Sequence, residues 1–497
     1  MTTGSLMVLG TMSSAGKSLV AAGLCRLYAR RGIRAAPFKA QNMSNNAAVC
    51  SGGEIGQAQA VQAAAAGVEP SVHMNPILLK PESDSRSQVV VHGQMWDALT
   101  AARFYERRED LRRAVVHSLD YLLHSYDLII MEGAGSPAEM NLYKHDLVNL
   151  FPARHAGAPC LLVGDIDRGG IFAQLLGTLW LLEDDDRPFI RGLLPNKFRG
   201  DPNLFADGIR FLEHRSSLPV LGLLPYLHDH GIPDEDAASL SGHNSPSGDA
   251  QDIAVVRLPH ISNFDDFDPL AFEPGVHLRY VSQPGQLGSP AAVILPGTKN
   301  TLEDLDWLHR SGFTDAIRTL ADRGASIVGL CGGFQMLGES VHDESGLESI
   351  LGKVEGLGLL PNRTRLQPAK TVSRSRGTVL ADCGFLNDVA STAIHGYEIH
   401  LGLTSGSNPL FHISQREGSA VDVPDGGCSG DGRIWGTYLH GVFDNDAFRR
   451  AWLESLGVQP STDSFQQRRT RSYDRLADVL EENLNIDLLD RIIEEGV

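Results

Sequence analysis

Short apolar runs alternate with longer helical patterns along this chain, and this alternation limits the folds available to it. The first series of runs lies at residues 6–9, 35–38, 128–131, 160–163, 192–194 and 220–224. Between the first two runs, Val20, Leu24 and Leu27 share one face of a helix. Residues 54–66 are rich in alanine and predict a further helix. Strands that alternate with helices favour a parallel sheet covered on both faces, so the sequence predicts an α/β fold.

A polar stretch of small residues (DEDAASLSGHNSPSGDAQ, 234–251) interrupts this rhythm, which restarts with apolar runs at 253–258, 291–295 and 326–330. The chain has 497 residues, which at roughly 150 residues per domain allows three domains or two large ones. Because the rhythm restarts after this stretch, we predict two doubly wound domains, at 1–235 and 251–447. A linker at 236–250 joins them, and a helical extension follows at 448–497.

Composition narrows the classes of partner. Lys and Arg total 43 against 61 Asp and Glu, a net charge of −18 that disfavours binding to nucleic acid or an anionic membrane surface. The six cysteines include no CxxC pair, which fits a reducing compartment. The longest apolar stretch, 171–182, is shorter than the ~20 residues that span a bilayer. We expect a cytoplasmic protein without a nucleic-acid or membrane partner, and the sequence leaves its oligomeric state open.

The first apolar run leads into GTMSSAGKS (10–18) and then into the first helix. A strand, a loop of small residues and a helix direct several backbone N–H groups at one point, where phosphates bind. The strict GxxxxGK[ST] spacing is off by one, since Thr11 holds the first position and Gly10 precedes it. Lys17 would reach the terminal phosphates and the Ser18 hydroxyl would hold Mg²⁺. The nucleotide-binding residues predicted in this loop are Thr11, Ser13, Ser14, Ala15, Gly16, Lys17 and Ser18.

Glu132 ends the apolar run 128–131 and is followed by Gly-Ala-Gly. Ligands of open α/β sheets collect at the carboxyl ends of strands, and a carboxylate there suits a second Mg²⁺ ligand. Asp165 and Asp167, after the run 160–163, are weaker candidates for the same role.

Cys331 follows the apolar run 326–330 and precedes Gly332, Gly333 and a helical pattern. This arrangement resembles a nucleophile elbow with cysteine in place of serine. A helix N-terminus lowers a thiol pKa, and the N–H groups of Gly332 and Gly297 would stabilise an oxyanion. The other five cysteines are interpreted as small buried hydrophobic residues.

A thiolate also needs a base, and His440 in the segment TYLHG (437–441) is the best placed of 18 histidines. His395 and His400 are the rival candidates.

Taken together, these motifs resemble those of the cobyric acid synthases, the glutamine-dependent amidotransferases of cobalamin biosynthesis. The resemblance extends over about residues 4–445. It rests on the Cys331 elbow, QNMSNN (41–46), NPILLKP (75–81), residues 164–170 and 295–301, YEIH (397–400) and YLHG (438–441).

The resemblance implies a fold and an activity for each half. The N-terminal half is similar to dethiobiotin synthetase, a P-loop NTPase-like parallel sheet, and the C-terminal half to flavodoxin-like class I glutamine amidotransferases. It implies ATP and Mg²⁺ as cofactors, L-glutamine as the ammonia donor, and a corrinoid substrate, adenosylcobyrinic acid a,c-diamide. The b, d, e and g carboxylates would be amidated through acyl phosphates, and Lys39 would help to hold the carboxylate or the γ-phosphate.

Two features leave alternatives open. Most class I members place a Glu two residues after the catalytic His, but this chain has Val442 there. The group that orients His440 is therefore open, with Asp444 one candidate.

Three rival functions stay open. They are an amidoligase of another pathway, such as CTP synthase, a ParA/MinD-like nucleotide switch, and an ATPase with an inactive amidotransferase domain.

Overall fold

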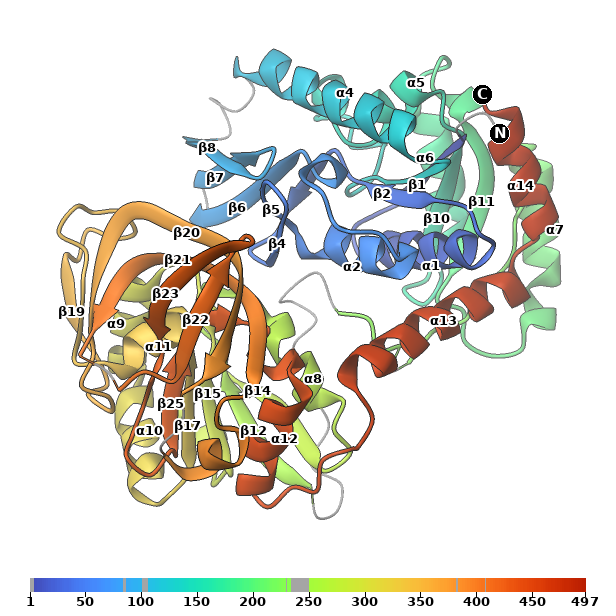
Figure 1. The fold of residues 1–497 in the computed structure, drawn as a ribbon. Helices are drawn as coiled ribbons and strands as arrows, with labels where there is room; N and C mark the ends of the chain where they lie inside the picture. Colours follow the sequence, from blue (N-terminus) through green and yellow to red (C-terminus); the bar gives the residue numbers. More distant parts are fainter. Residues whose placement is uncertain are drawn as a thin grey trace. The chain divides into compact units, whose positions relative to one another are not determined.

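A computed structural model describes residues 4–83, 86–100, 106–228, 230–233, 250–380, 383–406 and 408–497 (Figure 1). Its contacts divide the chain into two compact units. The first comprises Met1–Ser44, Cys50–Pro233 and Arg469–Val497, and the second comprises Asn45–Val49 and Asp234–Arg468. The linker predicted at 236–250 lies outside the described residues, apart from Ala250.

A five-stranded parallel sheet forms the centre of the first unit, with strand order β11-β10-β1-β9-β2. Its register places Met7 of β1 opposite Cys160 of β10 and Met131 of β9. Strands covered on both faces are apolar along their whole length, which is why the sequence predicted them. The strands are β1 (Gly4–Gly10), β2 (Ala35–Phe38), β9 (Leu128–Glu132), β10 (Cys160–Asp165) and β11 (Ile190–Asn196).

Alternate side chains of β1 enter two hydrophobic clusters on opposite faces of this sheet. Leu6 and Val8 pack with α1 (Lys17–Arg30), α13 (Phe465–Asn483) and α14 (Ile486–Glu495). Met7 and Leu9 belong to the other cluster, with α4 (Arg108–Ser125), α5 (Leu150–Ala156) and α6 (Ile171–Leu181). The helices α2 (Gln57–Ala66) and α7 (Ala206–Ser216) complete the unit. The α/β prediction is confirmed.

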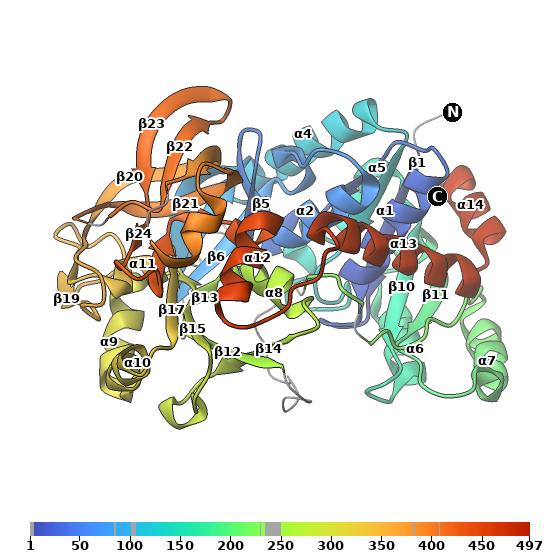
Figure 2. The ribbon, with the colours of Figure 1, turned by 60° about the horizontal axis from the view of Figure 1, so that its bottom comes forward.

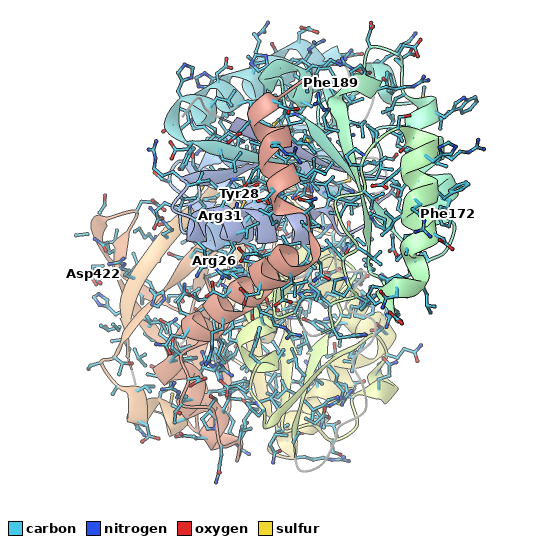
Figure 3. The ribbon with its side chains drawn as sticks, turned by 90° about the vertical axis from the view of Figure 1, so that its right-hand side faces the viewer. Arg26, Tyr28, Arg31, Phe172, Phe189 and Asp422 are labelled. Carbon is cyan, nitrogen blue, oxygen red and sulfur yellow. The ribbon has the colours of Figure 1, made fainter. Side chains whose placement is uncertain are left out.

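The C-terminal helices are an integral part of the first unit. The Tyr28 hydroxyl donates to Asp490 at 2.8 Å, and Arg26 of α1 bonds Asp474 of α13 at 2.8 Å (Figure 3). A Cβ atom at Gly23 would lie 2.4 Å from Leu480 Cδ1, so the absence of a side chain at Gly23 leaves room for the leucine side chains of α13. Of the helical extension predicted at 448–497, the part from Arg469 onward groups with the first unit and covers one face of its sheet, whereas residues 448–468 group with the second unit.

Two predictions within the first unit need correction. The helix predicted at 54–66 is present but starts only at Gln57, because Gly53–Gly56 form strand β5 and Gly56 is extended. The predicted strand at 220–224 makes only isolated bridges, at Val220 and Gly222. Pro219 and Pro225 flank this run and lack the N–H that a strand ladder needs.

A second sheet in this unit was not anticipated. It has the order β3-β6-β7-β8, and its last three strands are antiparallel neighbours. The strands are β3 (Gln41–Met43), β6 (Ile77–Ser83), β7 (Arg86–Val91) and β8 (Gln94–Thr100).

The second unit has its own six-stranded sheet, of order β14-β12-β15-β17-β25-β24, parallel except for the edge strand β24. Figure 2 shows β12, β15 and β17 side by side. The strands are β12 (Gln251–Val256), β14 (Val276–Val281), β15 (Ala292–Leu295), β17 (Ser326–Leu330), β24 (Gly427–Cys428) and β25 (Ile434–Thr437). The helices are α8 (Asp268–Ala271), α9 (Thr301–Ser311), α10 (Phe313–Asp322), α11 (Gly332–Leu337) and α12 (Asp446–Ser455).

A largely antiparallel sheet accompanies it, of order β19-β18-β20-β21-β26, in which β22 also pairs with β20 and β23 pairs with β22. The two-residue strands β13 (Ile261–Ser262) and β16 (Gly297–Thr298) pair separately. The strands of the larger sheet are β18 (Ser340–His342), β19 (Lys353–Glu355), β20 (Arg363–Val379), β21 (Ala393–Ser405), β22 (Phe411–Arg416), β23 (Ser419–Asp425) and β26 (Leu439–His440).

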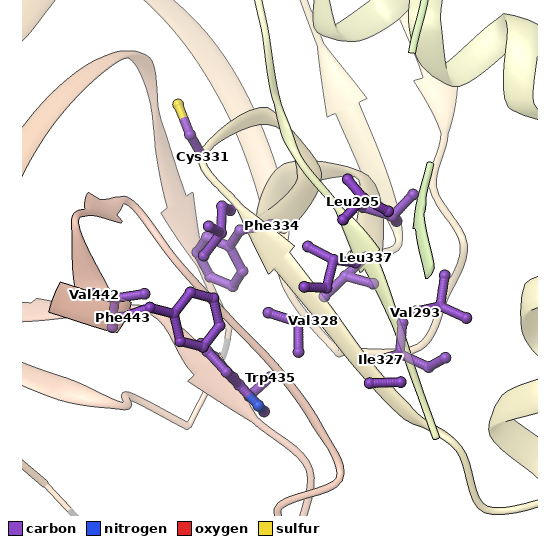
Figure 4. Close-up of a cluster of buried hydrophobic side chains, with 14 of the residues drawn as sticks. Val293, Leu295, Ile327, Val328, Cys331, Phe334, Leu337, Trp435, Val442 and Phe443 are labelled. Carbon is purple, nitrogen blue, oxygen red and sulfur yellow. The ribbon is translucent and has the colours of Figure 1, made fainter. Parts of the chain in front are cut away.

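A hydrophobic cluster lies beneath the loop after β17. Val328, Phe334, Trp435 and Phe443 pack together, and Figure 4 shows the Cys331 sulfur pointing away from them. Among the described residues, no helix combines the length and apolar character required to cross a membrane.

Candidate active sites

The loop between β1 and α1 wraps around the side chain of Lys17. Lys17 is buried, and its Nζ donates to the carbonyls of Met12 at 3.0 Å and Gly135 at 3.1 Å. A Cβ atom at residue 10 would lie 2.9 Å from Lys17 Cδ, which explains a glycine one position before the usual one. Ser14 and Gly16 have φ of 59° and 98°, so the loop turns sharply before the helix starts.

Glu132, at the end of β9, collects three donors on one buried carboxylate. Ser18 Oγ and Lys39 Nζ each donate to Oε1 at 2.8 Å, and Gln62 Nε2 donates to Oε2 at 2.5 Å. The structure thus brings together three residues that the sequence predicted from separate segments. A hydroxyl and a carboxylate oxygen are ligands that Mg²⁺ prefers, so this donor set fits the ion.

Gln62 of α2 was not predicted. Its Nε2 also contacts the Ser18 carbonyl at 3.4 Å, and its Oε1 is buried without a hydrogen-bond partner. The signal in the sequence is a set of three glutamines, Gln57, Gln59 and Gln62, on a helix otherwise made of alanine and valine.

The other side of the loop is fixed from the end of β11. Asn196 Nδ2 donates to the Ala15 carbonyl at 2.9 Å, while Lys197 Nζ bridges the Ser14 carbonyl and Asp165 at 2.6 and 2.9 Å. Asp167 pairs with Arg199 at 2.7 Å. Both aspartates weighed as metal ligands therefore make ion pairs. Thr11 Oγ1 donates to Gln174 Oε1 at 3.1 Å.

In the second unit, Cys331 occupies a strained turn between β17 and α11. Its φ and ψ are 53° and −108°, a conformation that non-glycine residues rarely adopt. Its Sγ donates to the Ile399 carbonyl at 3.4 Å. A Cβ at Gly333 would lie 2.0 Å from the Leu295 carbonyl, so this glycine allows the helix to pack against the neighbouring strand. The geometry is that of a nucleophile elbow.

His440, on β26, is held by an aspartate that the sequence analysis missed. Its Nδ1 lies 2.7 Å from Asp266 Oδ2, and the N–H of Gly441 donates to Asp266 Oδ1 at 2.7 Å. Asp266 lies in the short 3₁₀ helix η6 (Phe264–Phe267) and is buried. The signal was the pair Asp265-Asp266 between two phenylalanines, but 174 residues separate Asp266 from His440.

The environment of His440 favours its charged form. Burial alone lowers the pKa of His440, but the Asp266 carboxylate and a hydrogen bond with the Cys331 thiol raise that pKa well above its ordinary value. With Asp266 accepting from Nδ1, the other ring nitrogen is left for the thiol proton. An aspartate, a histidine and a cysteine in series can activate sulfur for attack on a carbonyl carbon.

The rival histidines are placed differently. His400 stacks on Tyr438, with ring centroids 3.9 Å apart, and its Nε2 lies 3.5 Å from Glu398. His395 is exposed.

Val442 occupies the position where most class I amidotransferases have a glutamate, and its side chain is fully buried in the cluster of Figure 4.

The two glycines predicted to form the oxyanion site lie near these residues. A Cβ at Gly297 would lie 3.2 Å from His440 Cε1, and one at Gly332 would lie 2.6 Å from Thr298 Cγ2. Gly297 and Thr298 form β16, so both predicted donors lie at the same strand.

Elsewhere in the described chain, burial raises the pKa of the Cys25 and Cys160 thiols far above the usual range, which suits structural cysteines.

Comparison with known proteins identifies both units. Residues 6–236 match the CobQ/CobB/MinD/ParA nucleotide binding domain, and residues 252–448 match the CobB/CobQ-like glutamine amidotransferase domain. A solved structure of a glutamine amidotransferase aligns with a TM-score of 0.30 and 16% identity, over 41% of this chain and 99% of that one.

Relatives are similar over nearly the whole chain. The cobyric acid synthase of Chloroflexus aurantiacus is 51% identical over 98% of this chain and 99% of its own length. That of Roseiflexus castenholzii is 54% identical over 94% of this chain and 95% of its own length.

Together, a nucleotide-binding unit and a glutamine amidotransferase unit define a glutamine-hydrolysing amidoligase. The chain belongs to the cobyric acid synthase family, whose reaction is a glutamine-dependent amidation in cobalamin biosynthesis. This membership decides against the rival functions that the sequence left open.

Proposed function

We propose that the protein converts adenosylcobyrinic acid a,c-diamide into adenosylcobyric acid. ATP would activate the b, d, e and g carboxylates, and glutamine would supply the nitrogen. The observation that carries this proposal is the series Asp266, His440 and Cys331 at a strained elbow, because it provides a nitrogen-releasing site in the same chain as a phosphate loop.

Activation would take place at the loop 10–18. A corrinoid carboxylate oxygen attacks the γ-phosphorus of ATP, ADP leaves, and the resulting acyl phosphate offers ammonia a good leaving group. Lys17 would neutralise the terminal phosphates, and Lys39 would hold the incoming carboxylate or the γ-phosphate. Ser18 and Glu132 would hold Mg²⁺, which supplies charge neutralisation when bound. Thr11, Ser13, Ser14, Ala15 and Gly16 would line the phosphates.

Nitrogen release would take place at Cys331. The thiolate attacks the side-chain amide carbon of glutamine, and the N–H groups of Gly297 and Gly332 stabilise the oxyanion. His440 gives its proton to the departing ammonia. It then takes a proton from water, which attacks the thioester and releases glutamate. Asp266 keeps the imidazole oriented through both steps and stabilises its charged form.

The test is Cys331→Ala, assayed for corrinoid amidation with glutamine or with ammonia as nitrogen donor. Glutamine-driven amidation should fall by at least about a thousandfold, because the nucleophile is gone, while ammonia-driven amidation should persist. Mass spectrometry follows each carboxyl-to-amide conversion, and NMR of the product identifies the side chains amidated.

The matched control is Cys428→Ala, since Cys428 is a buried cysteine of the same unit. Burial, and to a lesser extent a hydrogen bond with Cys383, raises the pKa of the Cys428 thiol to about 12. This control should keep both activities. Loss of ammonia-driven amidation in Cys331→Ala, with Cys428→Ala fully active, would count against separate sites.

A further inference from the structure

Tyr397 lies against the imidazole of His440. The two rings are stacked, with centroids 5.1 Å apart and planes inclined by 14°. Tyr397 is on β21 and pairs directly with His440 of β26. The backbone pairing and the ring contact act together, so the tyrosine restricts both the position and the tilt of the imidazole.

The Tyr397 hydroxyl is in turn held by Asn263. Asn263 Nδ2 donates to Tyr397 Oη at 3.0 Å and to the Ala47 carbonyl at 2.9 Å. An amide NH₂ group has two hydrogens, so these two acceptors use both. Asn263 is buried, has a φ of 51°, and directly precedes the 3₁₀ helix that carries Asp266. Asn263 therefore directly precedes the helix that carries Asp266 and is hydrogen-bonded to Tyr397, the two residues that hold His440.

Ala47 belongs to a segment with an unusual place in the chain. Residues 45–49 group with the second unit, whereas Ser44 and Cys50 on either side of them group with the first. The segment includes the last two residues of QNMSNN, Asn45 and Asn46. Within the second unit, the Ala47 carbonyl therefore joins this segment to the hydrogen-bond network around His440.

We propose that Asn263 and Tyr397 are positioning residues for His440 and connect the imidazole to the main chain of residues 45–49. This proposal rests on the proposed glutaminase function of Cys331 and His440. A displacement of the Ala47 carbonyl removes one acceptor of the Asn263 amide, and the amide then reorients and releases the Tyr397 hydroxyl. The stacked ring loses its anchor, and His440 becomes less well aligned with Cys331. Glutamine hydrolysis therefore depends on the conformation of 45–49.

Two substitutions break this network at different bonds. Tyr397→Phe keeps the ring but removes the hydroxyl that accepts from Asn263. Asn263→Gly removes the amide and retains a residue that tolerates a φ of 51°. Each should lower kcat for glutamine hydrolysis by about tenfold and change KM by less than about twofold, since neither residue is proposed to contact glutamine. The double variant should resemble the single ones, because both break the same connection.

The dependence on 45–49 has its own readout. The readout is the ratio of the glutamine hydrolysis rate with ATP and the corrinoid to the rate without them. In the wild-type chain we expect this ratio to exceed one, and in both variants it should fall to about one. Ammonia-driven amidation should be retained, which reports on folding and on the phosphate loop. Tyr280→Phe is the matched control, since it removes a tyrosine hydroxyl that donates to the Phe264 carbonyl of the same unit at 3.5 Å.

Additive losses in the double variant, a wild-type ratio of one, or an unchanged ratio in the variants would each overturn the proposal. A wild-type chain without any glutamine hydrolysis would instead refute the proposed function.

Discussion

At the scale of single residues, the contact between Asp266 and His440 has the most direct chemical consequence. The carboxylate accepts from Nδ1 and from the Gly441 N–H, so it fixes both the tautomer and the position of the imidazole. The Asp266 side chain that accepts both hydrogen bonds has almost no exposed surface, so water does not compete for them.

Asp266→Asn should therefore impair glutamine hydrolysis strongly. The amide can donate to Nδ1 and stabilise the wrong tautomer, so kcat should fall between about a hundredfold and ten-thousandfold, with little change in KM. Steady-state glutaminase assays measure this loss, and ammonia-driven amidation reports on the rest of the chain. Asp315→Asn, at an exposed position of α10, should behave as wild type. Equal activity of the two variants would exclude Asp266 from the mechanism.

The residues that the sequence predicted have local signals, and the ones it missed do not. Cys331, Lys17 and Ser18 were recognisable because a strand, a turn and a helix follow one another within about a dozen residues. Asp266 and Gln62 become visible only when distant segments meet, since 174 and 70 residues separate them from His440 and Glu132. The reason for a glycine at position 10 is visible only in the structure, where the Lys17 side chain lies close to it.

At the scale of elements, three histidines connect η1 (Val72–Met74), the end of β7 and α4. His73 and His92 both contact the Ser118 hydroxyl, at 3.1 and 2.9 Å, and the His117 ring lies 5.6 and 5.7 Å from their centroids. Burial lowers the pKa of His73 and of His92. Neighbouring imidazoles lower each pKa further, while a hydrogen bond with the Ala114 carbonyl partly opposes the shift at His92. The folded chain therefore favours their neutral forms.

This cluster should make the first unit sensitive to acid. Above the ordinary histidine pKa of about 6.5 both states are neutral, and as the pH falls below it the unfolded chain takes up protons first. Stability is thus retained above that pH and lost as the pH falls through the depressed folded values. Thermal melting at pH 7.5 and 5.5 should show a drop that becomes smaller in the double variant His73→Gln, His92→Gln. An identical drop in the variant and the wild type would contradict this account.

The elements predicted correctly and those missed differ in their burial. Strands such as β10 and β17 are covered on both faces and therefore appear as unbroken apolar runs. By contrast β20 alternates buried with exposed positions and contains four arginines and a lysine. Its long pairing with β21 depends on contacts across the hairpin, so neither its length nor its register was predictable.

At the scale of the whole molecule, the chain combines two chemistries whose residues come from interleaved segments. The nucleotide-binding unit includes the C-terminal helices, and the amidotransferase unit includes residues 45–49. Apolar periodicity predicted the helices of the C-terminal extension, but the face they cover depends on close contacts such as that between Gly23 and Leu480. The central claim is that the carboxylate is activated at Glu132 and Lys17 while nitrogen is released at Cys331.

The measurement that tests this claim most directly is a paired assay of Glu132→Gln, with corrinoid amidation from ammonia measured beside basal glutamine hydrolysis. The account predicts that ammonia-driven amidation falls by at least about a hundredfold, because Glu132 loses the charge that holds Ser18 and Lys39 and that would hold Mg²⁺. Glutamine hydrolysis should keep its wild-type rate. Asp127→Asn, an exposed carboxylate just before the same strand, serves as the control and should keep both activities. Wild-type amidation from ammonia in Glu132→Gln, or loss of both activities in a folded variant, would contradict the account.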